Sequence, residues 1–218
     1  VLLIASKRAR VKQFLATFRV VGLRCGHLEV APSAAARLLA GQSTLYALVD
    51  LDRQHTVISI AQAGHLRFSR TVKTGYWEWV QRLRNSLEAS EWEALALLRQ
   101  FGLHTSGRDH IHLDDAETQG VLPEALHAQM VRDICAPGLA QLRTEIRRTV
   151  DYFALLPGGQ RVSQIFLLGS LLPKGLAQAI EESINIPVAP LRVDMGASSL
   201  AEDAAPRWAV AMGLALRQ

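Results

Sequence analysis

The pattern of hydrophobic and polar positions is clearest between Leu45 and Thr74, where it predicts three consecutive β-strands. The strands are apolar or alternate apolar with polar residues, as buried and half-buried strands do. Turn residues separate them at Asp52-Arg53-Gln54 and at Ala63-Gly64-His65. Because adjacent strands joined by short turns pair antiparallel, the segment is expected to form a three-stranded meander.

The residues before this meander predict a β-α-β unit. Apolar residues at helical spacing indicate a helix from Lys7 to Gly22. Apolar runs on either side, Val1–Ala5 and Leu23–Val30, indicate strands, so a crossover connection is the economical interpretation. A small-residue helix is expected from Pro32 to Ala40. Since the chain begins inside a predicted strand, we expect it to be the later part of a longer protein.

The rest of the chain predicts a helical middle followed by alternating strands and helices. Residues 76 to about 160 are expected to be mostly helical, with one apolar stripe that we assign to core packing. The stripe consists of Leu139, Leu142, Ile146, Val150 and Phe153. A strand from Val162 to Leu168 leads into a helix from Pro173 to Ile184. Ile186–Val193 predicts a short edge strand, because prolines interrupt it, and Asp203–Leu216 predicts the last helix.

Composition indicates a globular protein. At 218 residues and 49% hydrophobic content, the chain can bury a substantial core. Its net charge of +4 permits contact with acidic lipid or nucleic acid, but the basic residues are scattered, which disfavours a nucleic-acid interface. Cys25 and Cys135 lie far apart in apolar surroundings, so a reducing cytosol fits and a disulfide framework does not. Neither a signal peptide nor a run of about eighteen apolar residues is present in the sequence.

Two strand ends carry candidate chemistry. Asp50 and Asp52 are two residues apart and share a face if the strand stays regular, which could hold Mg²⁺ together with ATP. A solvated turn acid beside a structural aspartate is the other, commoner interpretation. Gly169, where a buried strand meets a helix, would let the backbone approach a flat or anionic ligand, although packing glycines are commoner at such places.

Three other motifs lack part of what their chemistry would need. His110 and His112, with Asp114 and Asp115 nearby, could ligate a metal but lack a further ligand pair, so no metal site is proposed. Ser170 follows a strand, yet it lacks the Gly-x-Ser-x-Gly elbow of serine hydrolases. The Gly-x-Gly-x-x-Gly fingerprint of dinucleotide-binding folds is missing from the sequence as well.

Several segments together carry a family resemblance. They are Val49–Asp52 with Thr56, Arg67–Arg70 with Gly75, Glu145–Phe153, Ile165–Leu176 and Pro206–Leu216. In this order they resemble PilM, the actin-like cytoplasmic protein of type IV pilus assembly, and the related MSHA biogenesis protein MshI. The resemblance implies an α/β, actin-like ATPase (ribonuclease H-like) fold with a mixed sheet and flanking helices. Residues 1–41 would be a remnant of the first actin-like domain, and residues 42–218 the second domain, with a helical insertion at about 77–135.

The resemblance also implies a nucleotide site. Its residues in this chain would be Asp50, Asp52, Thr56, Gly169 and Ser170, with ATP and Mg as cofactors. The family has glycine where this chain has Asp52, and a Gly-Gly pair where it has Gly169-Ser170. A glycine amide can close on a phosphate, whereas a carboxylate repels it unless a divalent cation intervenes. We therefore expect ATP binding to be weakened or lost, and no catalytic residue is assigned.

By the same resemblance, the function implied is that of a scaffold in a type IV or MSHA-type pilus assembly complex. The expected partners are the cytoplasmic tail of a PilN-like inner-membrane protein and other pilus assembly proteins, at the cytoplasmic face of the inner membrane. One alternative is an active actin-like ATPase or sugar-kinase relative, which would use Asp50 and Gly169. A basic nucleic-acid-binding module is the second alternative.

Overall fold

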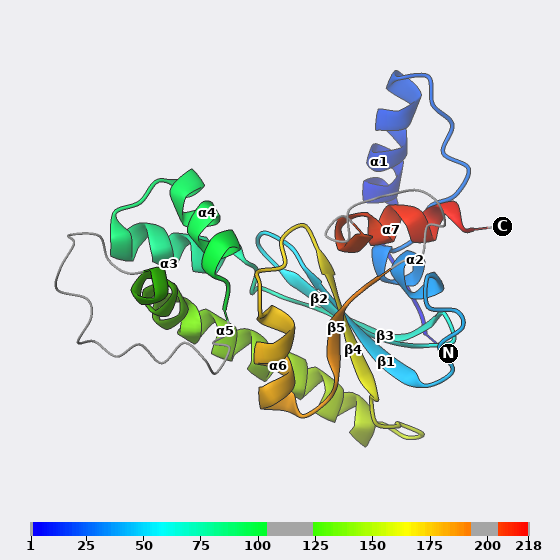
Figure 1. Cartoon of the computed structure of the whole chain (residues 1–218). Helices are drawn as coiled ribbons and strands as arrows, with labels where there is room; N and C mark the ends of the chain where they lie inside the picture. The colour runs from blue at the N-terminus through cyan, green and yellow to red at the C-terminus, as the bar shows by residue number, and fades with distance from the viewer. Residues whose placement is uncertain (1, 104–123, 193–204, 218) are drawn as a thin grey trace, which may run out of the picture.

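The structure is a computed structural model of the 218-residue chain and describes residues 2–103, 124–192 and 205–217 (Figure 1). It contains one sheet with helices on both faces. The strands are β1 (Leu45–Leu51), β2 (Thr56–Gln62), β3 (His65–Val72), β4 (Gln164–Gly169) and β5 (Val188–Pro190). The helices are α1 (Arg8–Val20), α2 (Ala31–Arg37), α3 (Trp77–Leu87), α4 (Glu91–Phe101), α5 (Glu124–Leu155), α6 (Leu176–Ile184) and α7 (Ala205–Ala215).

The sheet has the strand order β3-β2-β1-β4-β5. The three strands nearest the β3 edge form the predicted antiparallel meander, and its second turn places Ala63 and Gly64 at positive φ. β4 pairs with β1 in parallel, and β5 pairs with β4 in parallel over three residues. The mixed sheet, the meander and the edge position of β5 are confirmed, and the segments predicted at 45–74 and 162–168 share this one sheet.

The central strand β1 explains why both faces of the sheet are covered. Successive side chains of a strand point to opposite faces. Val49 and Leu51 belong to the large core cluster with α3 to α6, whereas Tyr46 and Leu48 belong to the smaller cluster beneath α2 and α7. Figure 1 shows these two groups of helices on either side of the sheet. A strand buried on both faces is apolar almost throughout, as β1 is.

The longest helix, α5, packs its predicted apolar stripe against the core. Leu142 and Ile146 are fully buried, and Phe153 lies against Phe68 of β3 with ring centroids 6.2 Å apart. In its amino-terminal half, α5 meets α3 at Gly138. A Cβ at this position would lie 2.6 Å from the Trp79 ring. Because Gly138 has no side chain, Trp79 can be completely buried there. The α3 and α4 helices with this half of α5 form the helical lobe.

The prediction for the amino-terminal segment is wrong in part. Its helix is present as α1, but residues 2–7 and 21–30 form no strand, so the β-α-β unit is absent from the structure. A strand needs a neighbour for its hydrogen bonds, and no other described segment supplies one here. α1 has no buried residue and extends away from the rest of the chain (Figure 1).

Candidate functional site: the cleft at the ends of β4 and β5

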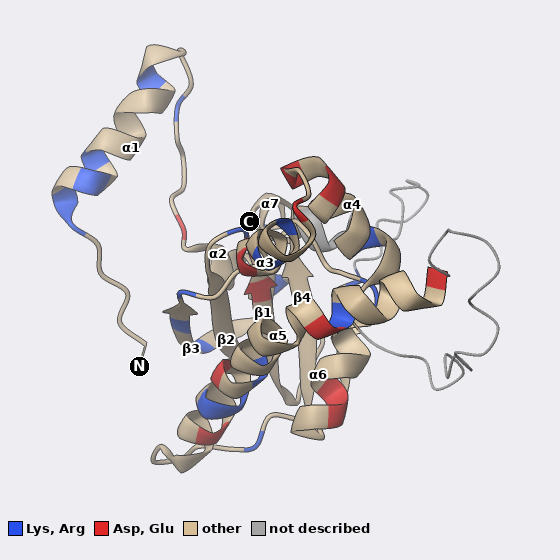
Figure 2. Ribbon diagram, turned by 90° about the vertical axis from the view of Figure 1, so that its left-hand side faces the viewer, with Lys and Arg blue, Asp and Glu red and all other residues tan. Residues whose placement is uncertain are grey.

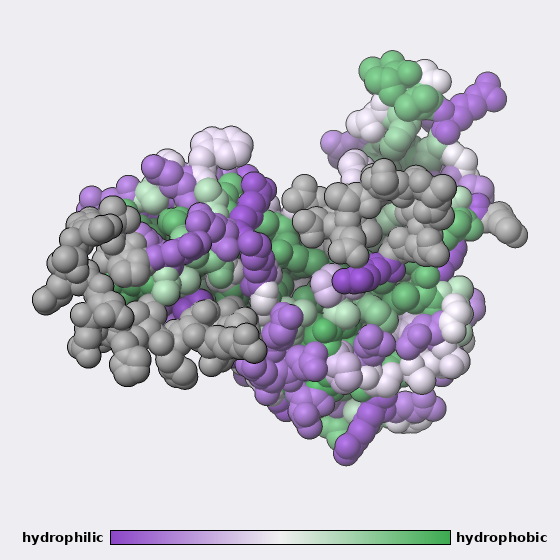
Figure 3. Space-filling view, in the orientation of Figure 1, coloured by the Kyte–Doolittle hydropathy of each residue, from purple (hydrophilic) through white to green (hydrophobic). Residues whose placement is uncertain are grey.

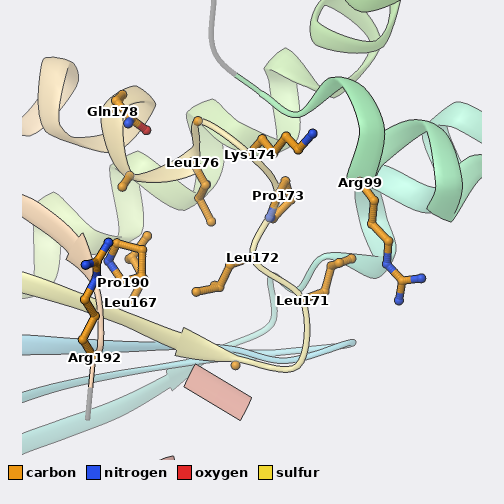
Figure 4. Close-up of a pocket in the computed structure, with 13 residues that line it drawn as sticks. Arg99, Leu167, Leu171, Leu172, Pro173, Lys174, Leu176, Gln178, Pro190 and Arg192 are labelled. Carbon is orange, nitrogen blue, oxygen red and sulfur yellow. The ribbon is translucent and has the colours of Figure 1, made fainter. Parts of the chain in front are cut away.

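A cavity of about 470 Å³ lies where β4 gives way to α6 (Figure 4). Its apolar lining includes Leu167, Leu171, Leu172, Leu176, Pro173 and Pro190. The Leu172 and Leu176 side chains both point into this space. The carboxyl ends of parallel strands are the usual ligand position in open α/β sheets, so this cleft is the candidate functional site.

The cleft carries positive charge. Arg99 comes from α4, Lys174 from the β4–α6 connection, and Arg192 from the residues after β5. The described lining includes no carboxylate. A cavity with apolar walls and three cationic side chains favours a ligand that has a flat or apolar part and a negative charge.

Gly169, a predicted site residue, is among the residues that line this cleft, but packing alone also requires a glycine there. Gly169 pairs with Leu51 across the β1–β4 ladder and has a φ of 136°, which side chains rarely adopt. A Cβ there would overlap the Leu51 carbonyl oxygen and lie 2.9 Å from its carbonyl carbon. The next residue, Ser170, is exposed and does not line the cavity. The glycine therefore lets the two strand ends approach, whether or not a ligand is bound.

Asp50 lies near the end of β1, opposite Leu168 of β4 and half-buried. Burial raises the pKa of the Asp50 carboxyl above its ordinary value, and the negative charge of Asp52 raises it further. His55 acts in the opposite direction. Holding a carboxylate here therefore destabilises the fold, which is common for residues kept for binding or catalysis.

Asp52 lies beyond the end of β1, so β1 does not continue to carry both aspartates as one regular strand. Its carboxylate is exposed, accepts a 2.7 Å hydrogen bond from the Arg53 N–H, and lies 3.7 Å from His55 Nε2. Its own N–H donates to the His55 carbonyl at 3.0 Å. In this structure Asp52 is thus a solvated acid that closes its own turn.

This turn is also tied to the helical lobe. The Arg53 guanidinium stacks 3.9 Å above the Trp77 ring centroid and forms a 3.2 Å ion pair with Glu91. The Trp77 N–H donates to the Arg53 carbonyl, which fixes the start of α3 beside the turn. These contacts give the turn a defined position relative to α3 and α4.

Thr56 is fully buried, and its hydroxyl donates to the Thr74 carbonyl. The hydroxyl therefore joins the start of β2 to the residues that follow β3, and it is not directed at the cleft. Of the five predicted site residues, the structure places Gly169 in the cavity lining, while Asp50, Asp52, Thr56 and Ser170 are outside it. The β1–β4 pairing nevertheless brings the Asp50 turn and the Gly169 turn to the same end of the sheet.

Sequence reasoning missed the three cationic residues of the cleft. Lys174 lies in the connection after Gly169, so proximity in sequence could have suggested it. Arg99 lies about seventy residues earlier in the chain and reaches the cleft only because the helical lobe packs beside β4. The predicted His110–Asp115 motif lies outside the described residues. Among described residues, no cluster of three or more His, Cys, Asp or Glu could hold a metal ion.

The fold is similar to those of several solved structures. No family model and no curated protein sequence matches the chain. A chain of the PilM-PilN type IV pilus biogenesis complex is similar over 95% of this chain, with a TM-score of 0.71 and 19% identity. The ethanolamine utilization protein EutJ from Carboxydothermus hydrogenoformans is similar over 97% (TM-score 0.65, 15% identity). MreB5 of Spiroplasma citri, bound to AMPPNP, is similar over 97% (TM-score 0.66, 11% identity).

These likenesses define the class: the chain has the fold of the actin-like ATPases. The particular protein predicted from the sequence motifs, PilM, is among its structural neighbours, so the resemblance is confirmed at the level of fold. The chain spans 57% of the matched chain of the PilM-PilN complex, 62% of the EutJ chain and 65% of the MreB5 chain. It therefore corresponds to less than two thirds of each of these proteins.

Proposed function

We propose that this chain is part of an actin-like scaffold protein of a type IV or MSHA-type pilus assembly complex, which acts by binding other proteins. The observation that carries the proposal is the likeness to a chain of a PilM-PilN type IV pilus biogenesis complex over 95% of this chain. The sequence motifs agree with it, because they resemble the same family in the same order. A fold alone does not define a function, so binding is the property to test.

The proposed partner is the cytoplasmic tail of a PilN-like inner-membrane protein, joined by other pilus assembly proteins. The proposed location is the cytoplasmic face of the inner membrane. In the described part of the chain, none of the helices combines the length and apolar character needed to cross a bilayer. Attachment to the membrane through a partner is consistent with that finding. Figure 2 shows Lys and Arg spread over several elements, so nucleic acid is not proposed as a partner.

For the nucleotide, we propose weakened or lost binding of Mg-ATP. The apolar cleft could hold a base, with Gly169 against it and the cationic side chains at its edge. Asp50 and Asp52, however, are outside the lining of this cleft, at the β1 turn on the same end of the sheet. A polyphosphate that extended to that turn would meet their carboxylates. Without a divalent cation between them, these charges repel. The residues therefore fit the nucleoside part of ATP better than its phosphates.

An active ATPase is the second candidate, since MreB5, which shares the fold, is solved with AMPPNP and with ADP. In that case Asp50 would orient a metal ion or the attacking water. Mg-ATP affinity in the micromolar range, together with steady phosphate release from the intact protein, would establish it. It would also refute a degenerate site.

The partner proposal is tested by pull-down of the intact protein from detergent-solubilised membrane fractions. Enrichment of a PilN-like membrane protein, identified by mass spectrometry, supports the scaffold function. The site proposal is tested separately by calorimetric titration of Mg-ATP into Asp52→Asn, which removes the charge, and into Gln54→Gly, which only loosens the same turn. We expect Asp52→Asn to bind about tenfold more tightly than the parent and Gln54→Gly to bind equally.

A further inference from the structure

A second cavity, of about 530 Å³, lies on the helical lobe and shares no residue with the cleft. We call it the α4–α5 groove, because its walls are one face of α4 and the first turns of α5, with the end of α3 closing it. Its apolar lining includes Leu87, Ala96, Leu97, Met130 and Val131. Gln100 and His127 also line it. In Figure 3 the helical lobe lies at the left.

One end of the groove is acidic. Glu88 and Glu93 both line it and are both exposed, and the described lining contains no lysine or arginine. Within the ranges that the structure describes, neither glutamate forms an ion pair. Glu93 is held in place because its side chain accepts the Ser90 N–H at 2.8 Å in a capping box. Hydrogen bonding to the Ser90 side chain, and then to its backbone N–H, lowers the pKa of Glu93, so the carboxylate stays charged.

The α4 helix also carries a large exposed aromatic residue, which is outside the lining of the groove. Trp92 precedes Glu93 on α4 and is 79% exposed, although Trp79 of the neighbouring helix is completely buried. Ala96 lies one helical turn further along, so Trp92 and Ala96 share one side of α4. Exposed tryptophans beside an apolar depression are typical of protein-binding surfaces.

We propose that the α4–α5 groove binds an amphipathic helix of a partner protein. Its apolar face would insert between α4 and α5, with anchors at positions i, i+3, i+4 and i+7. Its lysines and arginines would meet Glu88 and Glu93 at the acidic end, which gives the complex its orientation. The inference rests on the groove alone and does not depend on a pilus function.

The probe is a fluorescent 18-residue Leu-Lys peptide with leucines on one helical face, titrated with the chain in fluorescence anisotropy. A Leu-Glu peptide of the same pattern is the control for charge, and a scrambled Leu-Lys peptide is the control for amphipathicity. We expect the Leu-Lys peptide, and neither control peptide, to bind saturably. This binding should weaken as salt is added. No saturable binding, or equal binding of either control peptide, would overturn the proposal.

Two pairs of variants locate the site. Ala96→Arg places a bulky cation in the groove, whereas Ala140→Arg is the same change at an exposed position of α5, about 15 Å beyond Met130 along that helix. Binding should weaken about tenfold or more in Ala96→Arg and stay unchanged in Ala140→Arg. Glu88→Gln should weaken it about threefold at low salt only, whereas Asp151→Asn should not. If the two variants of either pair changed peptide binding equally, the binding site would lie elsewhere. Melting temperatures equal to that of the parent chain confirm that the variants fold.

Two further measurements identify the occupant. If sedimentation equilibrium shows self-association of the chain that Ala96→Arg abolishes, the groove holds a second copy instead of a partner. If the peptide binds only after residues 104–123 are replaced by a Gly-Ser linker, the groove belongs to the chain's own segment. Either result would overturn the proposal of a foreign helix.

Discussion

Replacing Gly169 by alanine separates the two roles that a glycine at this strand end could have. If Gly169 is needed only to let a ligand approach, Gly169→Ala should fold as stably as the parent chain and lose only binding. The structure predicts instead a loss of stability without any ligand, because the residue combines a positive φ with contact to the neighbouring strand.

The expected loss has two parts. A φ of 136° is nearly reserved for glycine, and forcing alanine into such a conformation costs about 1–3 kcal/mol. The new methyl group would also lie 2.9 Å from the Leu51 carbonyl carbon and 3.0 Å from its nitrogen, closer than ordinary van der Waals contact. Separating two paired strand ends to relieve this overlap costs about 1–3 kcal/mol more. The sum is about 4 kcal/mol, or about 8–16 °C in melting temperature for a chain of this size.

The assay is thermal and urea unfolding of the chain without nucleotide, followed by circular dichroism. Gly158→Ala is the matched control, since Gly158 has a φ of 73° and a Cβ there meets nothing within 4 Å. Its free energy of unfolding should fall only by the cost of placing alanine in the left-handed conformation, about 1–2 kcal/mol. If Gly169→Ala were no less stable than Gly158→Ala, the close approach of β4 to Leu51 would be refuted, and Gly169 would have to be explained by a ligand.

Three further predictions follow from the same structure. Because the folded-state pKa of Asp50 is raised, the stability of the parent chain falls as pH rises through that pKa. The Asp50→Asn variant should therefore have a higher melting temperature than the parent at pH 7. This difference should vanish below pH 3.8, the ordinary pKa of the group. An equal difference at both pH values would contradict the burial of Asp50. Burial raises the pKa of Cys135 to about 12, so native protein should react with Ellman's reagent only at the exposed Cys25, and urea should release the second thiol. Rapid reaction of two thiols in the native state would be inconsistent with this. Gly213→Ala should lower the urea midpoint by the equivalent of about 1–3 kcal/mol, because a Cβ there would overlap the Ala34 carbonyl where α7 crosses α2. An unchanged midpoint would show that the two helices are further apart.

The features that the sequence predicts have a local signal, and the features that it does not predict depend on residues far apart in the chain. Elements whose signal is local were predicted: the meander from its turns, α5 from its apolar stripe, and the short β5 from its prolines. Their patterns arise from residues a few positions apart, so the sequence contains them directly. The predicted strands at 1–5 and 23–30 have similar local patterns but lack a neighbour to pair with in the described chain, and pairing is a non-local property.

The site shows the same division. The sequence by itself determined that an aspartate-bearing turn and a glycine-bearing turn each end a strand, and it supplied the resemblance to an actin-like protein. Only the tertiary structure decided that Thr56 gives its hydroxyl to Thr74, that Asp52 closes its own turn, and that Arg99 reaches the cleft. The reason is that the direction and partners of a side chain depend on elements far away in the sequence, which come together only when the sheet pairs and the helices pack against it.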